Sequence, residues 1–147
     1  MTTTSPRPFG LNLMAALNIG FGIYSIAGAS QLALALKLKL DPSNPPGFDP
    51  GIVMSLHALP MWFVVFALAA SLVKAGLLFT SAWGYYNFKR VAGRYVAMAY
   101  AAVSLGDSAV ALIGLPYPVT GGTFIGILYP VFTLLAVNTM WKPLLTR

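Results

Sequence analysis

The sequence is poor in the residues that carry metal, redox and nucleophilic chemistry. Its 147 residues include no cysteine, one histidine and three acidic side chains, all of them aspartates. Without thiols or a second imidazole, the chain by itself cannot form a Cys/His zinc site, an iron–sulfur cluster or a bis-histidine haem site. We therefore expect neither a metal site nor a cofactor.

Charged residues are also scarce. They make up only 8% of the chain, whereas about a quarter of the residues are charged in a typical soluble protein. Hydrophobic residues account for 58%, and a globule of this size could not cover its surface with so few ions. The composition excludes a soluble enzyme and predicts an integral membrane protein.

The sequence also lacks the common catalytic arrangements. No Ser/His/acid set can be placed on one side of a membrane, and neither paired carboxylates nor a phosphate-binding glycine-rich loop is present. We therefore expect that the protein is not an enzyme.

What the sequence does contain is long apolar runs. A transmembrane helix needs roughly 20 mainly apolar residues, and four segments reach that length. They run from about Phe9 to Leu36, Leu59 to Tyr86, Ala92 to Leu115 and Phe124 to Trp141. The pattern predicts an all-α, integral membrane four-helix bundle that forms a single transmembrane domain over residues 1–147.

A proline-rich outer loop at residues 41–50 separates the first two spans, because its four prolines cannot continue a helix. Residues 51–59 form either a short interfacial helix or the start of a long second helix that is kinked near Pro60. We favour the long helix.

Basic residues predict the orientation of the bundle. If the spans alternate, six of the eight basic residues that flank them lie on one side and only Lys37 and Lys39 lie on the other. The positive-inside rule then places both termini in the cytoplasm. The net charge of +6 is thus explained by topology, and we expect no nucleic-acid partner. The cluster Lys89, Arg90 and Arg94 can also contact anionic lipid head groups.

Two opposite charges fall within the apolar spans. Lys74 lies about twelve residues, or ~18 Å, from the inner end of the second span, and Asp107 lies at about the same depth in the third. An unpaired charge at the bilayer centre costs at least ~2.5–3.5 kcal/mol. We therefore predict a Lys74–Asp107 ion pair. It serves either as a structural bridge, which we favour, or as a relay in a transport path.

Three further features have an ordinary and a functional interpretation. His57 is expected at the outer interface as a hydrogen-bonded side chain, although such a residue can also bind a pigment or haem in a larger complex. Pro130 is expected to kink the fourth span, and it also frees a backbone carbonyl upstream for other partners. Asn12 and Asn18 in the first span need partners inside the protein.

Small residues recur four apart in the second and third spans, which predicts close contacts with neighbouring helices. The pairs and triplets are Ala67, Ser71 and Ala75; Gly76, Thr80 and Gly84; Ala97 and Ala101; Ala102 and Gly106; and Ser104 and Ser108.

Three stretches together resemble a broad set of small four-span bacterial membrane proteins of uncharacterised function. They are RPFGLNLMAALNIGFGIYSIAG from Arg7, WGYYNFKRVAGRY from Trp83 and YPVFTLLAVNTMWKP from Tyr129. The opening stretch carries Arg7, Pro8, Gly10, Asn18, Gly20 and Gly22, and Gly93 stands where Trp or Gly is common. The resemblance implies four spans and no known activity, and it carries over no ligand or catalytic residue.

These observations lead to two functional hypotheses for a multi-pass protein of a bacterial cytoplasmic (inner) membrane. The first, which we favour from sequence, is a non-catalytic protein that acts by helix packing, either as an accessory subunit of a larger membrane complex or with itself. The alternative is a small transporter or channel that uses the Lys74–Asp107 pair. A transporter needs a polar path, whereas a packing subunit needs only a dry bundle.

Overall fold

The computed structural model describes residues 9–41, 58–114 and 121–145, and this part of the chain is helical without any strand. The elements are α1 (Phe9–Leu40), α3 (Met61–Tyr86), the π-helical turn η1 (Val91–Tyr95), α4 (Val96–Gly114) and α5 (Gly121–Thr139). The predicted all-α bundle is therefore confirmed.

Three of these helical segments are long and apolar enough to cross a membrane. They are Phe9–Leu40, Met61–Tyr86 and Val91–Ile113, with mean hydropathies of 1.5, 2.1 and 1.7, while Phe124–Thr139 forms a shorter apolar helix. The fourth helix exists as expected, but it ends at Thr139 instead of Trp141.

The second helix does not continue from the preceding segment as we favoured. Leu59 and Pro60 are not helical, and Pro60 adopts an extended backbone with φ of −60° and ψ of 142°. With this extended backbone Pro60 is the N-cap residue of α3, which begins at Met61, and proline also disfavours helical backbone at the preceding Leu59. Residues 51–57 lie outside the described residues.

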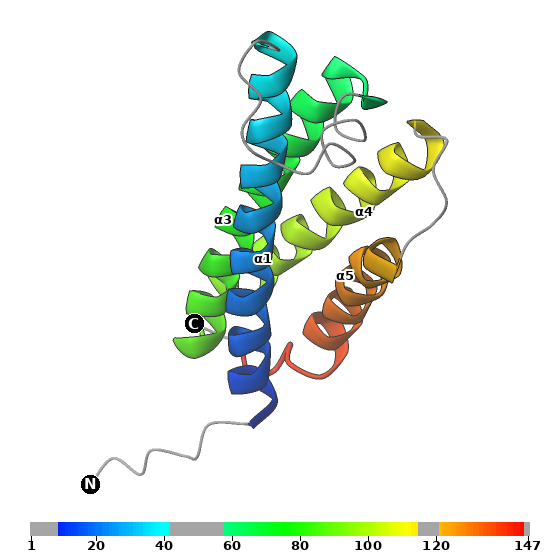
Figure 1. Cartoon of the computed structure of the whole chain (residues 1–147). Coiled ribbons are helices and arrows are strands. Elements are labelled where there is room, and N and C mark those ends of the chain that lie inside the picture. The colour runs from blue at the N-terminus through cyan, green and yellow to red at the C-terminus, as the bar shows by residue number, and fades with distance from the viewer. Residues whose placement is uncertain (1–8, 42–57, 115–120, 146–147) are drawn as a thin grey trace, which may run out of the picture.

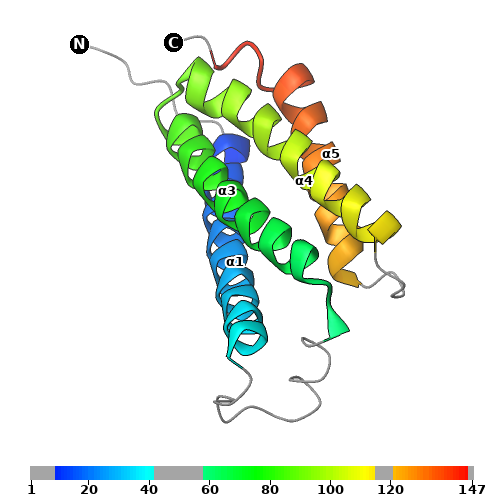
Figure 2. The same cartoon turned by 90° about the horizontal axis from the view of Figure 1, so that it is seen from above.

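The four helices form two pairs that diverge from a common end (Figures 1 and 2). α1 packs along α3, α4 packs on α5, and α3 and α4 connect the pairs. We call the end that holds Phe9, Tyr86 and Thr139 the closed end, and the end that holds Leu40, Met61 and Gly114 the open end. In the described chain, α1 and α5 make no extended contact with each other.

The hydrophobic core lies at the closed end, where all four helices converge. It is formed by Leu11, Met14, Ala15, Ala82, Tyr85, Ala97, Ala136, Val137, Trp141 and Leu145. The edge of the Tyr85 ring meets Trp141 with centroids 6.1 Å apart. This core fixes the point from which the two helix pairs diverge.

A contact between two glycines sets the approach of α3 to η1. A Cβ atom at Gly84 would lie 2.1 Å from the backbone nitrogen of Gly93, so only glycine fits there. The chain reverses between these elements at Phe88, whose φ of 55° is left-handed. The predicted close contact at Gly84 is confirmed, and Ala67, Ala75, Ala97 and Ala101 of the predicted contact faces are buried.

Other small residues of the predicted contact faces are exposed, namely Gly76, Thr80, Ala102 and Gly106. A Cβ atom at Gly76 or Gly106 would meet nothing within 4 Å. The expectation that these faces meet helices of the same chain is wrong for the described residues. The reason is that α3 and α4 turn their other faces toward α1 and α5.

Candidate functional site

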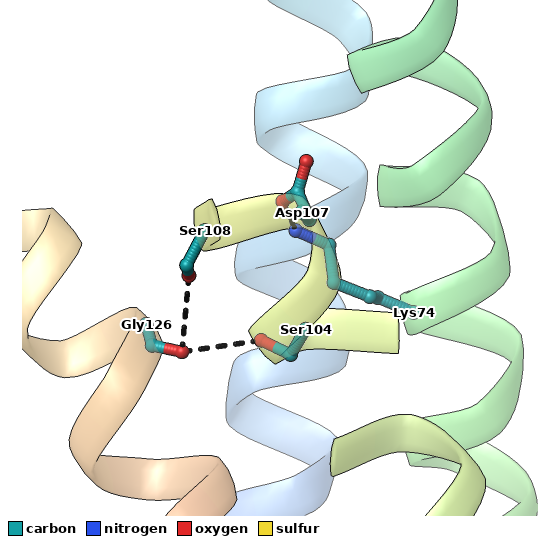
Figure 3. A network of polar contacts seen from close by, with 5 residues as sticks. All are labelled: Lys74, Ser104, Asp107, Ser108 and Gly126. Atoms are coloured by element: carbon teal, nitrogen blue, oxygen red, sulfur yellow. Dashed lines mark hydrogen bonds and ion pairs between the residues drawn. The ribbon is translucent and has the colours of Figure 1, made fainter. Parts of the chain in front are cut away.

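The two intramembrane charges lie together between α3 and α4. The Lys74 ammonium donates a hydrogen bond to Asp107 Oδ2 and forms an ion pair with it. The side chains are 16% and 21% exposed, so the pair is neither sealed in the core nor free on the surface. In Figure 3 the Lys74 side chain reaches from α3 to Asp107 on α4.

Local sequence explains why this pair forms. Lys74 stands among apolar residues on α3, whereas Asp107 stands between Ser104 and Ser108 on one face of α4. Since residues three and four apart share a helix face, the serines and the aspartate form one polar strip. The structure brings together the two residues that the sequence analysis singled out as partners.

The serines complete a second polar contact, with α5. Ser104 Oγ and Ser108 Oγ donate to the carbonyl oxygen of Gly126 at 3.3 and 3.5 Å. Gly126 lies four residues before Pro130, so its carbonyl is the one that loses its helical donor to proline. The freed acceptor that Pro130 predicts is thus occupied by hydroxyls of α4 (Figure 3).

These polar groups face a cavity of about 670 Å³ between the diverging helix pairs. Both ions line it, together with Ser104, Ser108 and Gly126. The remaining wall is apolar or aromatic and comes from α1, α4 and α5. It consists of Ala16, Leu17, Gly20, Phe21, Tyr24, Ser25, Tyr100, Ala111, Ile125 and Tyr129, with Ser25 as a further polar group.

A hydrogen-bond network links three helices beside this cavity. The Tyr129 hydroxyl donates to Asn18 Oδ1, and Asn18 Nδ2 donates to Ser81 Oγ at 2.6 Å. The Ser81 hydroxyl in turn donates to the Leu78 carbonyl at 3.0 Å. The Tyr129 ring also lies against Phe21, with centroids 4.3 Å apart. This network ties α5 to α1 and α3.

The two asparagines of the first span thus differ. Asn18 is buried at 1% exposure and has the internal partners that we expected. The Asn12 side chain is exposed instead, because it lies on a face of α1 that no neighbouring helix covers.

The basic cluster lies at the closed end of the bundle. Lys89 and Arg90 are exposed, and the Arg90 guanidinium lies 5.8 Å from the Tyr95 ring centroid. Arg94 is half-buried and donates to Asn138 Oδ1 of α5 at 3.1 Å. Arg94 therefore connects η1 to α5, while Lys89 and Arg90 are accessible to lipid head groups.

His57, the candidate pigment or haem ligand, lies outside the described residues. Among the described residues, no group of three histidine, cysteine or acidic residues could hold a metal ion.

The sequence analysis missed the cavity and its aromatic wall. Phe21, Tyr24 and Tyr100 carry no charge, and nothing in their spacing separates a cavity wall from a lipid-facing surface. The available signal was Asn18, because a buried amide in the middle of a span requires polar partners on other helices.

Comparison with known proteins adds no relative: the chain matches no protein-family model, no curated protein and no solved structure.

The site offers both hydrogen-bond donors and hydrogen-bond acceptors. The ammonium and the two hydroxyls are hydrogen-bond donors, and the carboxylate and the carbonyl are acceptors. Aromatic and aliphatic side chains surround these groups, and such a site can bind a small molecule.

Proposed function

We propose that this chain is a non-catalytic, multi-pass protein of a bacterial inner membrane that binds a small ligand at the Lys74–Asp107 pair, as a carrier or transporter does. The observation that supports this function is the 670 Å³ cavity lined by both ions. Its volume falls within the ~300–1,000 Å³ range typical of small-molecule sites. The geometry therefore favours the transporter hypothesis over a dry packing subunit.

A membrane location with four crossings fits the dimensions of the helices. At ~1.5 Å per residue, the 19 residues of α5 are about 28 Å long, and its apolar part Phe124–Thr139 is about 24 Å long. We take this helix as the fourth span of the ~30 Å hydrocarbon core. Both termini would then lie on the side of the closed end, where Lys89, Arg90 and Arg94 are located. The positive-inside rule makes this the cytoplasmic side.

Native mass spectrometry of protein extracted from its own membrane tests the proposal. Gly20 lines the cavity, and a Cβ atom there meets nothing within 4 Å, so Gly20→Phe places a ring in the empty space. Gly28→Phe on the same helix is the matched control, because Gly28 also has open space but does not line the cavity. We expect a bound small molecule on the wild type and on Gly28→Phe that Gly20→Phe loses. Equal adduct patterns on all three proteins would contradict ligand binding in the cavity.

The packing role expected from sequence remains a second candidate, favoured by the open faces at Gly76 and Gly106. Gly106 lies in a shallow groove between α3 and α4 that is lined by Val73 and Val103. Small residues of this kind allow close helix contact between copies or with another membrane subunit. If this face is an interface, Gly106→Leu will lower the mass of the particle in mild detergent, whereas Gly28→Leu will not.

A further inference from the structure

The net charge of the cavity restricts what it can hold. Its two ions, Lys74 and Asp107, neutralise each other, and no other charged side chain among the described residues lines the cavity. A ligand with a net charge would have to separate the pair or remain uncompensated inside the membrane, and both are unfavourable. The polar end of the ligand should therefore be neutral.

The ion pair also selects the kind of polar group. Lys74 has three N–H donors, of which one is directed to Asp107 Oδ2. Among the described residues, no protein donor reaches the second carboxylate oxygen, Asp107 Oδ1. The pair therefore offers both donors and an acceptor to a ligand. A hydroxyl group, which both donates and accepts, satisfies them together.

Much of the remaining wall fits the apolar part of a ligand. Leu17, Phe21 and Ile125 line the cavity, and their side chains offer no hydrogen bonds to a polar ligand. A hydrocarbon chain or ring on these residues buries apolar surface on both partners.

The cavity also opens sideways. Leu17, Tyr24 and Ile125 line it and yet are 37%, 72% and 55% exposed. Leu17 and Tyr24 belong to α1 and Ile125 to α5, and these two helices make no extended contact with each other. Figure 2 shows the two helix pairs apart at the open end. In a four-span arrangement, the gap between α1 and α5 faces the hydrocarbon region, so a lipid-soluble molecule can enter without passing through water.

We infer that the cavity binds a neutral, lipid-soluble alcohol: a hydroxyl head at Lys74 and Asp107, with an apolar body along α1 and α5, taken up from the bilayer. This inference rests on the proposed function and adds the chemical class of its ligand.

Photo-crosslinking with matched single-chain probes tests the ligand class. The protein is placed in phosphatidylcholine vesicles with hexadecanol, hexadecyl sulfate or hexadecyltrimethylammonium, each carrying a diazirine at the same chain carbon. Labelling of residues 16–25 and 125–129 is mapped by mass spectrometry and divided by labelling of the exposed residues Val131, Phe132 and Leu135 of α5. We expect this ratio to be at least about tenfold higher for the alcohol than for either ion, because an uncompensated charge is strongly disfavoured within the membrane.

Variants then locate the labelling. Gly20→Phe and, from the opposite wall, Ile125→Trp should reduce the ratio for hexadecanol to that of the ionic probes, whereas Gly28→Phe should leave it unchanged. Two cavity-filling variants are used so that a folding defect in one, detected by circular dichroism, does not decide the result.

The outcomes separate the ligand class from the proposed function. A higher ratio for the sulfate or the ammonium probe would overturn the neutral-alcohol inference, while binding in the cavity would stand. If no probe labels the cavity above the lipid-exposed residues, entry from the bilayer is also overturned. Native mass spectrometry of Gly20→Phe and Gly28→Phe then tests ligand binding in the cavity independently of the ligand class and of the route of entry.

Discussion

At the scale of single residues, the ammonium of Lys74 and the carboxylate of Asp107 are each costly in a membrane, and each reduces the cost of the other. Both side chains line the cavity and remain paired at 16% and 21% exposure, and Asp107 also lines the groove that holds Gly106. A structural bridge and a binding group are therefore compatible roles for the same two residues.

Removing one charge tests the structural role. Asp107→Asn should lower the free energy of unfolding by about 2.5–3.5 kcal/mol, because Lys74 is left as an uncompensated charge. A thermal unfolding curve in detergent measures the effect, and adding Lys74→Gln should restore part of the loss. Unchanged thermal stability of the single variant would show that the pair does not stabilise the bundle.

The carbonyl of Gly126 lacks its helical hydrogen-bond donor and accepts hydrogen bonds from side chains instead. Pro130 removes the helical donor, and Ser104 and Ser108 supply hydroxyls in its place. We expect Pro130→Ala to return a backbone N–H to this carbonyl.

A double-mutant cycle measures that coupling. Ser104→Ala should cost about 0.5–1.5 kcal/mol of stability in the wild-type background, the usual contribution of one intramolecular hydrogen bond. In the Pro130→Ala background the same substitution should cost clearly less, since the carbonyl then has a helical donor. Identical costs in both backgrounds would refute the exchange of donors.

At the scale of the elements, the contact of α3 with η1 depends on two backbones that touch. Gly84→Ala would place its methyl group 2.1 Å from Gly93 N, a distance that requires the helices to separate. We expect a loss of at least ~2 kcal/mol, within the range of overpacked cores, measured by thermal unfolding. Gly106→Ala is the matched control and should be nearly neutral, because its methyl group enters open space.

A second element-scale prediction concerns the attachment of α5 to α1. Tyr129→Phe removes the hydroxyl that donates to Asn18 but keeps the ring on Phe21. We expect a loss of about 0.6–1.7 kcal/mol, as measured for hydrogen bonds between membrane helices. Hydrogen exchange should increase in α5 and remain unchanged in α3. Equal exchange in α5 of the two proteins would mean that the hydroxyl does not hold this helix.

The elements also show what the sequence can and cannot predict. Helix existence and approximate bounds follow from apolar length, and the Lys74–Asp107 pair follows from depth on adjacent antiparallel helices. The small residues at Gly76 and Gly84 look alike in sequence, yet Gly84 touches a backbone and Gly76 touches nothing. The choice between such faces depends on how far the helices diverge, and that is set by the packing of side chains distant in sequence.

At the scale of the whole molecule, the hydrophobic core lies at the closed end, and the two helix pairs separate toward the open end. Leu11, Tyr85 and Trp141 hold the closed end together, while the α1–α3 pair and the α4–α5 pair diverge toward the open end (Figure 1). Hydropathy alone could not predict the resulting cavity, because lipid-facing and cavity-facing walls have similar composition. The burial cost of Asn18 and Asp107 predicted polar partners for these residues but not a cavity beside them.

A density map of the protein in a lipid nanodisc, bound to an antibody fragment and prepared from its own membrane, tests the central claim most directly. The account predicts non-protein density between α1 and α5, within hydrogen-bond distance of Lys74 Nζ or Asp107. A map in which α1 and α5 pack together and leave no space beside the pair would contradict it.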